Sequence, residues 1–109
     1  MIRMAVTLLY ATFPSMQSAR KAVSGLLGKN LIACANFFMS ESHYKWKGRK
    51  VKEKECIAFI KTTPAKSILA RAEILKMHPY KIPCVLGFPA KANKSYEKWV
   101  FSQCRVSKN

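Results

Sequence analysis

The segment His78-Pro79-Tyr80-Lys81-Ile82-Pro83 strongly limits the folds open to this chain. Proline lacks a backbone N–H and has a fixed φ, so it ends a helix and favours extended geometry in the residue before it. A helix-like run, 65–77, ends just before this segment, and an apolar run, 82–88, begins within it. We therefore expect His78 to lie on a rigid turn between a helix and a strand. A histidine held in this way indicates a site or an interface.

The first part of the chain predicts a strand followed by a helix. Alternating side chains indicate a strand over 3–12. A short signal peptide is the alternative, but a helix start follows at once and leaves no cleavage-type spacer. Ser15 is a plausible N-cap and Gly28 can close this helix. Its expected inward residues are Met16, Ala19, Val23, Leu26 and Leu27.

The rest of the chain predicts further strands and two more helices. The apolar run 31–38 indicates a strand, and 43–46 with 51–61 indicate a hairpin about Gly48. Thr62-Thr63-Pro64 breaks the chain before the helix 65–77, and a fourth strand follows over 82–88. Spacing near the end indicates a short final helix. The expected inward residues of the helix 65–77 are Ile68, Leu69, Ala72 and Leu75, and those that mark the final helix are Tyr96, Trp99, Val100 and Gln103.

This order, β-α-β-β-α-β with a terminal helix, predicts an α+β fold of the ferredoxin-like plait type. With 109 residues, a single domain over 1–109 is expected. Helices cover one face of such a sheet and leave the other bare. The bare face would carry apolar and aromatic side chains, so it needs a partner, and a second copy of the chain is the simplest one.

Four motifs follow one another along the chain: Thr12-Phe13-Pro14, Leu31-Ile32-Ala33-Cys34-Ala35-Asn36, Tyr44-x-Trp46-x-Gly48 followed by Ile60-Lys61-Thr62-Thr63, and His78-Pro79-Tyr80-x-x-Pro83. In order and in register, they resemble those of the CutA family, named for divalent-cation tolerance. The resemblance covers residues 4–100 and implies a trimer of PII-like architecture, packed sheet to sheet. We therefore predict a homotrimer whose hairpin, 43–54, reaches a neighbour through Tyr44 and Trp46.

The resemblance also implies that copper or another divalent cation binds near the HPY turn. This sequence departs from the family at Ala11 and Met77, where some members have a cysteine and a second histidine. It departs again at Cys84, where a glutamate is usual. The donors that remain, His78, Met77 and Cys84, favour Cu(I) over Mg²⁺ or Ca²⁺. The alternative is that Met77 and Cys84 pack inward and His78 only hydrogen-bonds the turn.

The sequence leaves two further kinds of binding surface as alternatives. PII-type trimers bind ligands in clefts between subunits, and by this analogy Lys61, His78, Tyr80 and Trp99 could line a cleft for a small anion. The alternative is that Lys61 faces solvent and that Tyr80 and Trp99 fill the core. Fold-level analogy alone says little about function.

The net charge of +15 suggests a polyanion as another partner. Nucleic acid could bind the basic hairpin non-specifically, but a solvated hairpin explains the same charges. The strand 55–61 lacks the aromatic pattern with which RRM domains read RNA, so specific reading of bases is not expected. The basic residues are Lys45, Lys47, Arg49, Lys50, Lys52 and Lys54.

The cysteines and acids limit the chemistry of the chain. Cys34, Cys56, Cys84 and Cys104 include no CxxC pair, so neither a zinc knuckle nor a disulfide framework is expected. Free thiols fit a reducing compartment, and we predict the cytoplasm. Asp is absent, the five Glu are scattered, and no nucleophile or phosphate-binding motif is visible. We therefore predict a non-enzyme, and no apolar run is long enough to span a membrane.

Overall fold

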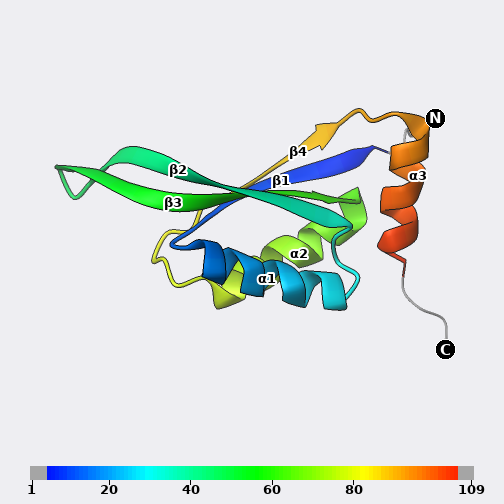
Figure 1. Ribbon diagram of the computed structural model, residues 1–109, viewed down its shortest axis with the longest axis horizontal. Coiled ribbons are helices and arrows are strands. Elements are labelled where there is room, and N and C mark those ends of the chain that lie inside the picture. The colour runs from blue at the N-terminus through cyan, green and yellow to red at the C-terminus, as the bar shows by residue number, and fades with distance from the viewer. Residues whose placement is uncertain (1–4, 106–109) are drawn as a thin grey trace.

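The structure is a computed structural model that describes residues 5–105. Its order of strands and helices confirms the predicted ferredoxin-like α+β fold (Figure 1). Boundaries differ by a few residues, and the predicted first strand begins outside the described residues. The elements are β1 (Val6–Phe13), α1 (Met16–Gly28), β2 (Cys34–Trp46), β3 (Arg49–Thr62), α2 (Pro64–Met77), β4 (Val85–Ala90) and α3 (Lys94–Gln103).

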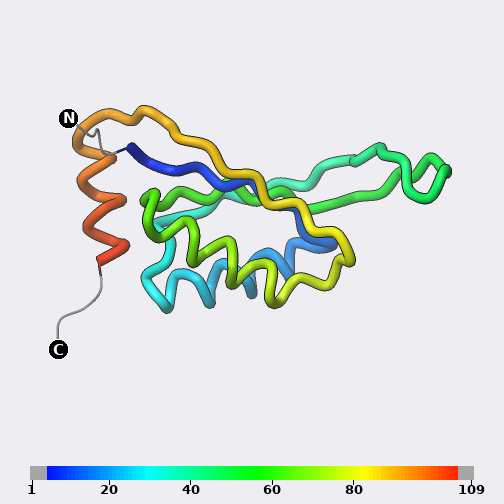
Figure 2. The backbone as a smooth tube through the Cα atoms, turned by 180° about the vertical axis from the view of Figure 1, so that it is seen from behind, coloured from blue at the N-terminus to red at the C-terminus, as the bar shows by residue number. Residues whose placement is uncertain are grey.

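The four strands form one antiparallel sheet in the order β2-β3-β1-β4. Helices α1 and α2 lie on one face, and α3 lies at the end of the sheet where β1 begins (Figure 1). The far half of the β2–β3 hairpin extends beyond the helices, as Figure 2 also shows from behind. In the described part of the chain no helix is long and apolar enough to cross a membrane.

The core lies between the sheet and its two covering helices. Leu9, Ile60 and Ile74 are fully buried there. Burying an aliphatic side chain of this size contributes about 1.5–3 kcal/mol. Because side chains alternate along a strand, the residues between the core positions of β1 and β3 lie on the opposite face. Helices α1 and α2 leave this face open, and α3 packs on it only at the end near Val6 and Cys34. The candidate site lies on this second face.

Strand β2 differs from its prediction. The runs 31–38 and 43–46 are not separate, because β2 continues without a break through the residues between them. Ser40 helps to join them, since its hydroxyl donates to the Glu55 carbonyl oxygen at 3.1 Å. Residues 31–33 are buried ahead of the strand rather than in it. No element was predicted over 39–42, because the β3 residues that pair with them are not visible from local pattern.

The ends of α1 are mostly as predicted. Ser15 caps the helix by accepting a bond from the Ser18 backbone N–H at 3.0 Å, and Ser18 reciprocates as in a capping box. Gly28 is the last helical residue, but Asn30, with φ of 58°, takes the left-handed conformation that lets the chain leave the helix. Leu27 was predicted to face inward and is instead 44% exposed.

The face of α2 that packs on the sheet was predicted wrongly. Its buried residues are Ser67, Ala70 and Ile74. Ile74 is the large apolar residue of this buried set, whereas Ile68 points outward and is 68% exposed. Apolar residues occur all around this helix, so their spacing does not define one face. The predicted inward residues that are exposed are Ile68, Leu69, Ala72 and Leu75.

The hairpin turn is formed by Lys47 and Gly48, as predicted for Gly48. Both have positive φ, 50° and 77°, and Trp46 pairs with Arg49 across them. Two-residue hairpin turns with this geometry match the twist of the flanking strands. The turn therefore sets the β2–β3 register, which determines the residues that share each face of the hairpin.

Candidate functional site

The HPY turn holds the imidazole of His78 at both ring nitrogens. Nε2 lies 2.6 Å from the Thr12 carbonyl oxygen, and Nδ1 accepts from the Tyr80 backbone N–H at 3.2 Å. The ring also stacks on Phe13 with centroids 5.1 Å apart. His78 is the C-cap of α2, as the prolines predict. A metal bound by His78 would have to replace one of these two hydrogen bonds.

Tyr80 connects this turn to β3. Its hydroxyl donates to the Glu55 carboxylate at 2.7 Å. Burial, and next the hydrogen bond to Glu55, raise the pKa of Tyr80 well above its ordinary value. The Glu55 residue is only 7% exposed. Tyr80 therefore stays a neutral donor at neutral pH and holds a buried carboxylate in place.

A second pair of the same kind lies further along the hairpin. The Tyr44 hydroxyl donates to the Glu53 carboxylate at 2.6 Å, and this bond is the main reason why the pKa of Tyr44 rises to about 12. Since side chains alternate, Tyr44, Glu53 and Glu55 all lie on the sheet face that the helices leave open. The hairpin thus has an acidic and aromatic face.

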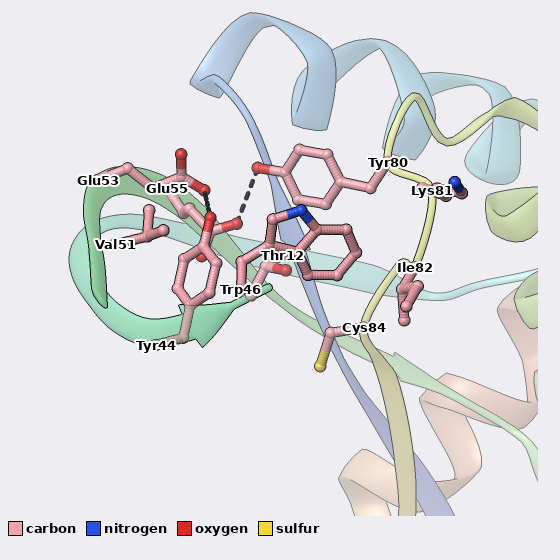
Figure 3. A pocket seen from close by; sticks show the side chains of 10 residues that line it. All are labelled: Thr12, Tyr44, Trp46, Val51, Glu53, Glu55, Tyr80, Lys81, Ile82 and Cys84. Carbon is pink, nitrogen blue, oxygen red and sulfur yellow. Dashed lines mark hydrogen bonds between the residues drawn. The ribbon is translucent and has the colours of Figure 1, made fainter. Parts of the chain in front are cut away.

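These two pairs line a pocket of about 540 Å³. It lies between the hairpin and the segment that joins the HPY turn to β4. Figure 3 shows the ring of Trp46 and the Tyr80 side chain on opposite elements, with the Glu53 and Glu55 carboxylates beside them. The lining residues are Thr12, Tyr44, Trp46, Val51, Glu53, Glu55, Tyr80, Lys81, Ile82 and Cys84.

The predicted metal donors are only partly brought together. Cys84 is half-buried and lines the pocket, whereas Met77 is 47% exposed at the end of α2. Burial, and next the charge of Glu55, raise the pKa of the Cys84 thiol. Ala11 is fully buried. Among residues 5–105, no three His, Cys, Asp or Glu side chains are grouped closely enough to hold a metal ion.

The predicted cleft residues lie at two ends of the sheet. Lys61 pairs with Leu8 on β1 and bonds to Asn36, whereas Tyr80 bonds to Glu55, six residues away along β3. Trp99 lies on α3, where its ring is tilted against that of Tyr96 with centroids 5.6 Å apart. One chain therefore does not bring Lys61 or Trp99 next to His78 and Tyr80. An anion cleft of these residues stays a prediction that needs more than one subunit.

Most of the predicted polyanion residues share one face of the hairpin. Lys45, Lys50, Lys52 and Lys54 alternate with the pocket residues and lie on the opposite side from Glu53. Lys47 is in the turn, and Arg49 follows it. The separation of charge on the hairpin is partial, because Glu41 pairs with Lys54 on the basic face and Arg49 pairs with Trp46 on the pocket face. Polyanion binding by this basic face stays a prediction.

The other cysteines are free and structural. Cys56 and Cys104 are buried, and the Cys34 thiol lies 3.1 Å from the Tyr96 hydroxyl. Burial raises the pKa of Cys56. Cys34 and Cys104 join α3 to the sheet, through Tyr96 and Thr62, and Cys56 contacts Met16 of α1. They act as small packing residues.

Comparison with known proteins identifies the family of this chain. The family model described as CutA1 divalent ion tolerance protein matches residues 7–103. The chain belongs to the CutA1 family. It is 37% identical, over 98 residues, to the divalent-cation tolerance protein CutA of Thermococcus kodakarensis, covering 89% of this chain and 94% of that protein. The predicted resemblance is confirmed.

Two solved structures extend the CutA1 likeness to the fold. The divalent ion tolerance protein CutA1 from Ehrlichia chaffeensis has a TM-score of 0.90 at 31% identity, covering 96% of this chain and all of the other. The periplasmic divalent cation tolerance protein CutA from Archaeoglobus fulgidus has a TM-score of 0.89 at 30% identity, covering 92% and 99%.

Several CutA-like motif residues have structural roles in this chain. Thr62 is fully buried, and its hydroxyl donates to the Leu31 carbonyl oxygen at 2.7 Å. Thr63 is the N-cap of α2. Sequence reasoning did not identify Glu53 and Glu55 as site residues. The available signal was two glutamates at alternate positions, on the same strand face as Tyr44, within an otherwise basic hairpin.

Proposed function

We propose that this protein works in divalent-cation tolerance as a homotrimeric binding module rather than as an enzyme. The observation that carries the proposal is the open sheet face. Leu86 and Phe88 on β4 are 54% and 44% exposed, and Phe38 on β2 is 44% exposed. Phe38 and Tyr10 both contact Phe59 between them, which makes the patch continuous. An apolar face of this kind on a small domain requires a partner surface.

The edges of the sheet support self-association as the way to cover this face. Strands β2 and β4 are the edges, so each copy offers two rows of unpaired backbone groups. The hairpin extends past the helices and carries Tyr44 and Trp46 on its open face, 40% and 39% exposed. Aromatic residues of this size dominate the energetics of interfaces. We assign them to the contact with a neighbouring subunit.

For the cation, the donor that fits best is Cys84. It lies in the pocket beside Glu55, and a thiolate there would favour a soft ion such as Cu(I). Met77 and His78 lie at the adjacent helix end. Because His78 already uses both ring nitrogens, we place it as a residue that supports the turn, and further donors would come from a neighbouring subunit or solvent.

Two measurements test the proposal on the reduced, full-length protein. Sedimentation equilibrium should give three times the chain mass, and a monomer at micromolar concentration would reject the trimer. Titration with Cu(I) against a competing chelator should show binding that Cys84→Ser removes. Cys34→Ser is the matched control, since Cys34 is also half-buried but lies by α3. Equal binding by both variants would reject Cys84 as the donor.

The predicted location in the cytoplasm remains part of this proposal. It is supported by the four cysteines, all of which are free in the structure. A relative whose name places it in the periplasm shows why the location needs its own test. Fractionation of cells that express the tagged full-length protein would provide that test.

A further inference from the structure

The pocket contains two carboxylates that have no cationic partner. In the described chain, the carboxylates that form ion pairs are those of Glu41 and Glu73. Glu53 and Glu55 form none, although the sequence has twenty Lys and Arg for five Glu. Removing a carboxylate from water is costly unless a positive charge or hydrogen bonds compensate it. Glu55 is 7% exposed and accepts one hydrogen bond, from Tyr80, so a cation from outside the described residues would complete the compensation of its charge.

Each carboxylate keeps one oxygen for a ligand. Tyr80 bonds to Oε2 of Glu55 and Tyr44 bonds to Oε1 of Glu53, and neither remaining oxygen accepts a bond from residues 5–105. No fully buried side-chain oxygen or nitrogen in that part of the chain lacks a partner, so the second oxygen of Glu55 is accessible. The two tyrosine hydroxyls fix the carboxylates and leave an acceptor on each.

The rest of the pocket is aromatic and aliphatic. Trp46, Tyr44 and Tyr80 supply ring faces that attract cations, and Val51 and Ile82 add apolar surface. A volume of about 540 Å³ is in the range of small-molecule sites. Lys81 also lines the pocket, but Figure 3 shows its amine directed away from both carboxylates. A ligand that fits these walls has an apolar body as well as a charge.

We propose that this pocket binds a small aliphatic ammonium ion. Its N–H groups would donate to the free oxygens of Glu53 and Glu55, and its carbon chain would pack against Trp46. An ammonium group needs only two or three acceptors, and the free oxygens of Glu53 and Glu55 supply two of them. In the proposed trimer, a neighbouring subunit that contacts Tyr44 and Trp46 closes the open side. The inference does not depend on copper binding.

The test uses the fluorescence of Trp46 in the full-length protein. Trp99→Phe removes the other of the two tryptophans, which lies on α3. Titration with 1,4-diaminobutane and with butylamine should give a saturable change in emission, and 1-butanol, the neutral analogue of butylamine, should give none. Glu55→Gln should weaken amine binding about tenfold or more, because a charge-assisted hydrogen bond is lost.

Glu41→Gln is the matched control, since Glu41 is exposed on β2 and pairs with His43 outside the pocket. Its affinity for the amines should stay within about twofold of the parent. Sedimentation of every variant reports on assembly. If Glu55→Gln changes the sedimentation mass, the amine affinity of Glu53→Gln, on the exposed part of the strand, tests the proposal instead. Unsaturable amine titrations, equal affinity in the glutamine variant, or a response to MgCl₂ without one to the amines would overturn the proposal.

Discussion

The imidazole Nε2–H of His78 donates to the Thr12 carbonyl oxygen at 2.6 Å, across 66 positions of the chain. The bond from the Tyr80 N–H to Nδ1 requires this tautomer, because Nδ1 then acts as the acceptor. The end of α2 is thereby tied to the end of β1. This connection brings the Tyr80 hydroxyl to Glu55, and Thr12 and Tyr80 both line the pocket.

Replacing His78 should therefore destabilise the fold. His78→Ala removes two hydrogen bonds and the stacking on Phe13, and we expect a loss of about 2 kcal/mol or more in the free energy of unfolding. Urea unfolding measures this. The other histidine, His43, is exposed on the hairpin, and His43→Ala should stay within about 0.5 kcal/mol of the parent. Similar values for both variants would contradict the role assigned to His78.

The hydroxyl of Thr62 gives a second stability prediction. Thr62→Val keeps the shape of the side chain but leaves the Leu31 carbonyl oxygen without this donor, so we expect a loss of about 1–3 kcal/mol. Thr7 pairs directly with Thr62 across the sheet, and no hydrogen bond of its hydroxyl is found within residues 5–105. Thr7→Val should be nearly neutral. The prediction fails if urea unfolding gives the two valine variants equal stability.

Two glycines should respond to alanine in opposite directions. Gly48 has φ of 77°, so Gly48→Ala should destabilise the hairpin by about 1 kcal/mol. Gly25 lies inside α1, and an added Cβ would meet nothing within 4 Å, so Gly25→Ala should stabilise by about 0.5–1 kcal/mol. Thermal unfolding of the two variants should move to opposite sides of the parent. Shifts of the same sign would refute the assigned conformations.

The pH dependence of stability should reflect Tyr96. Burial, and next the hydrogen bond with Cys34, raise its pKa from 10.0 to about 12. A raised pKa means that the folded state favours the neutral phenol, so this contribution is complete below pH 10 and is lost as the pH rises toward 12. The advantage of the parent over Tyr96→Phe should be constant up to pH 10 and shrink above it. A constant advantage across pH 10–12 would show that the shift is absent.

Trp46 gives the prediction about assembly. Trp46→Ala removes a large aromatic side chain from the proposed subunit contact, so we expect the trimer to dissociate at higher protein concentration than the parent. Sedimentation over a dilution series measures this. Ile68→Ala is the control, since Ile68 is 68% exposed on α2, on the side of the sheet away from the proposed contact, and the change should leave the dissociation unchanged. Unaltered mass and melting temperature in Trp46→Ala would remove this residue from the interface.

Much of the fold was predictable because its signals are local. Ser15, the Lys47-Gly48 turn and the prolines around His78 mark the ends of elements through their own backbone chemistry. The continuity of β2 was not local, because Ser40 is held by the Glu55 carbonyl oxygen of another strand. The packed face of α2 was equally hidden, since the small residues Ala70 and Ser67 are buried there while more hydrophobic residues of the helix are exposed.

The site was less accessible from the sequence than the fold. The turn around His78 was located correctly, but the acceptor of its Nε2–H is a backbone carbonyl group, which carries no side-chain signal. Glu55 becomes notable only when Tyr80 reaches it from 25 positions away. Glu53 and Glu41 both lie in the predicted hairpin region among polar residues, and the sequence does not distinguish them. In the structure, Glu53 lines the pocket and Glu41 does not.

The position of β1 in the sheet has a consequence for how the protein is made. β1 lies between β3 and β4, and both of these partners follow it in the chain. A nascent chain that emerges from its N-terminus therefore carries its central strand unpaired until residues 49–62 have been synthesised. Pairings so distant in sequence also slow folding. The β2–β3 hairpin can close early. Correct folding of the nascent protein then requires β1 to pair with β3 before a strand of another chain does.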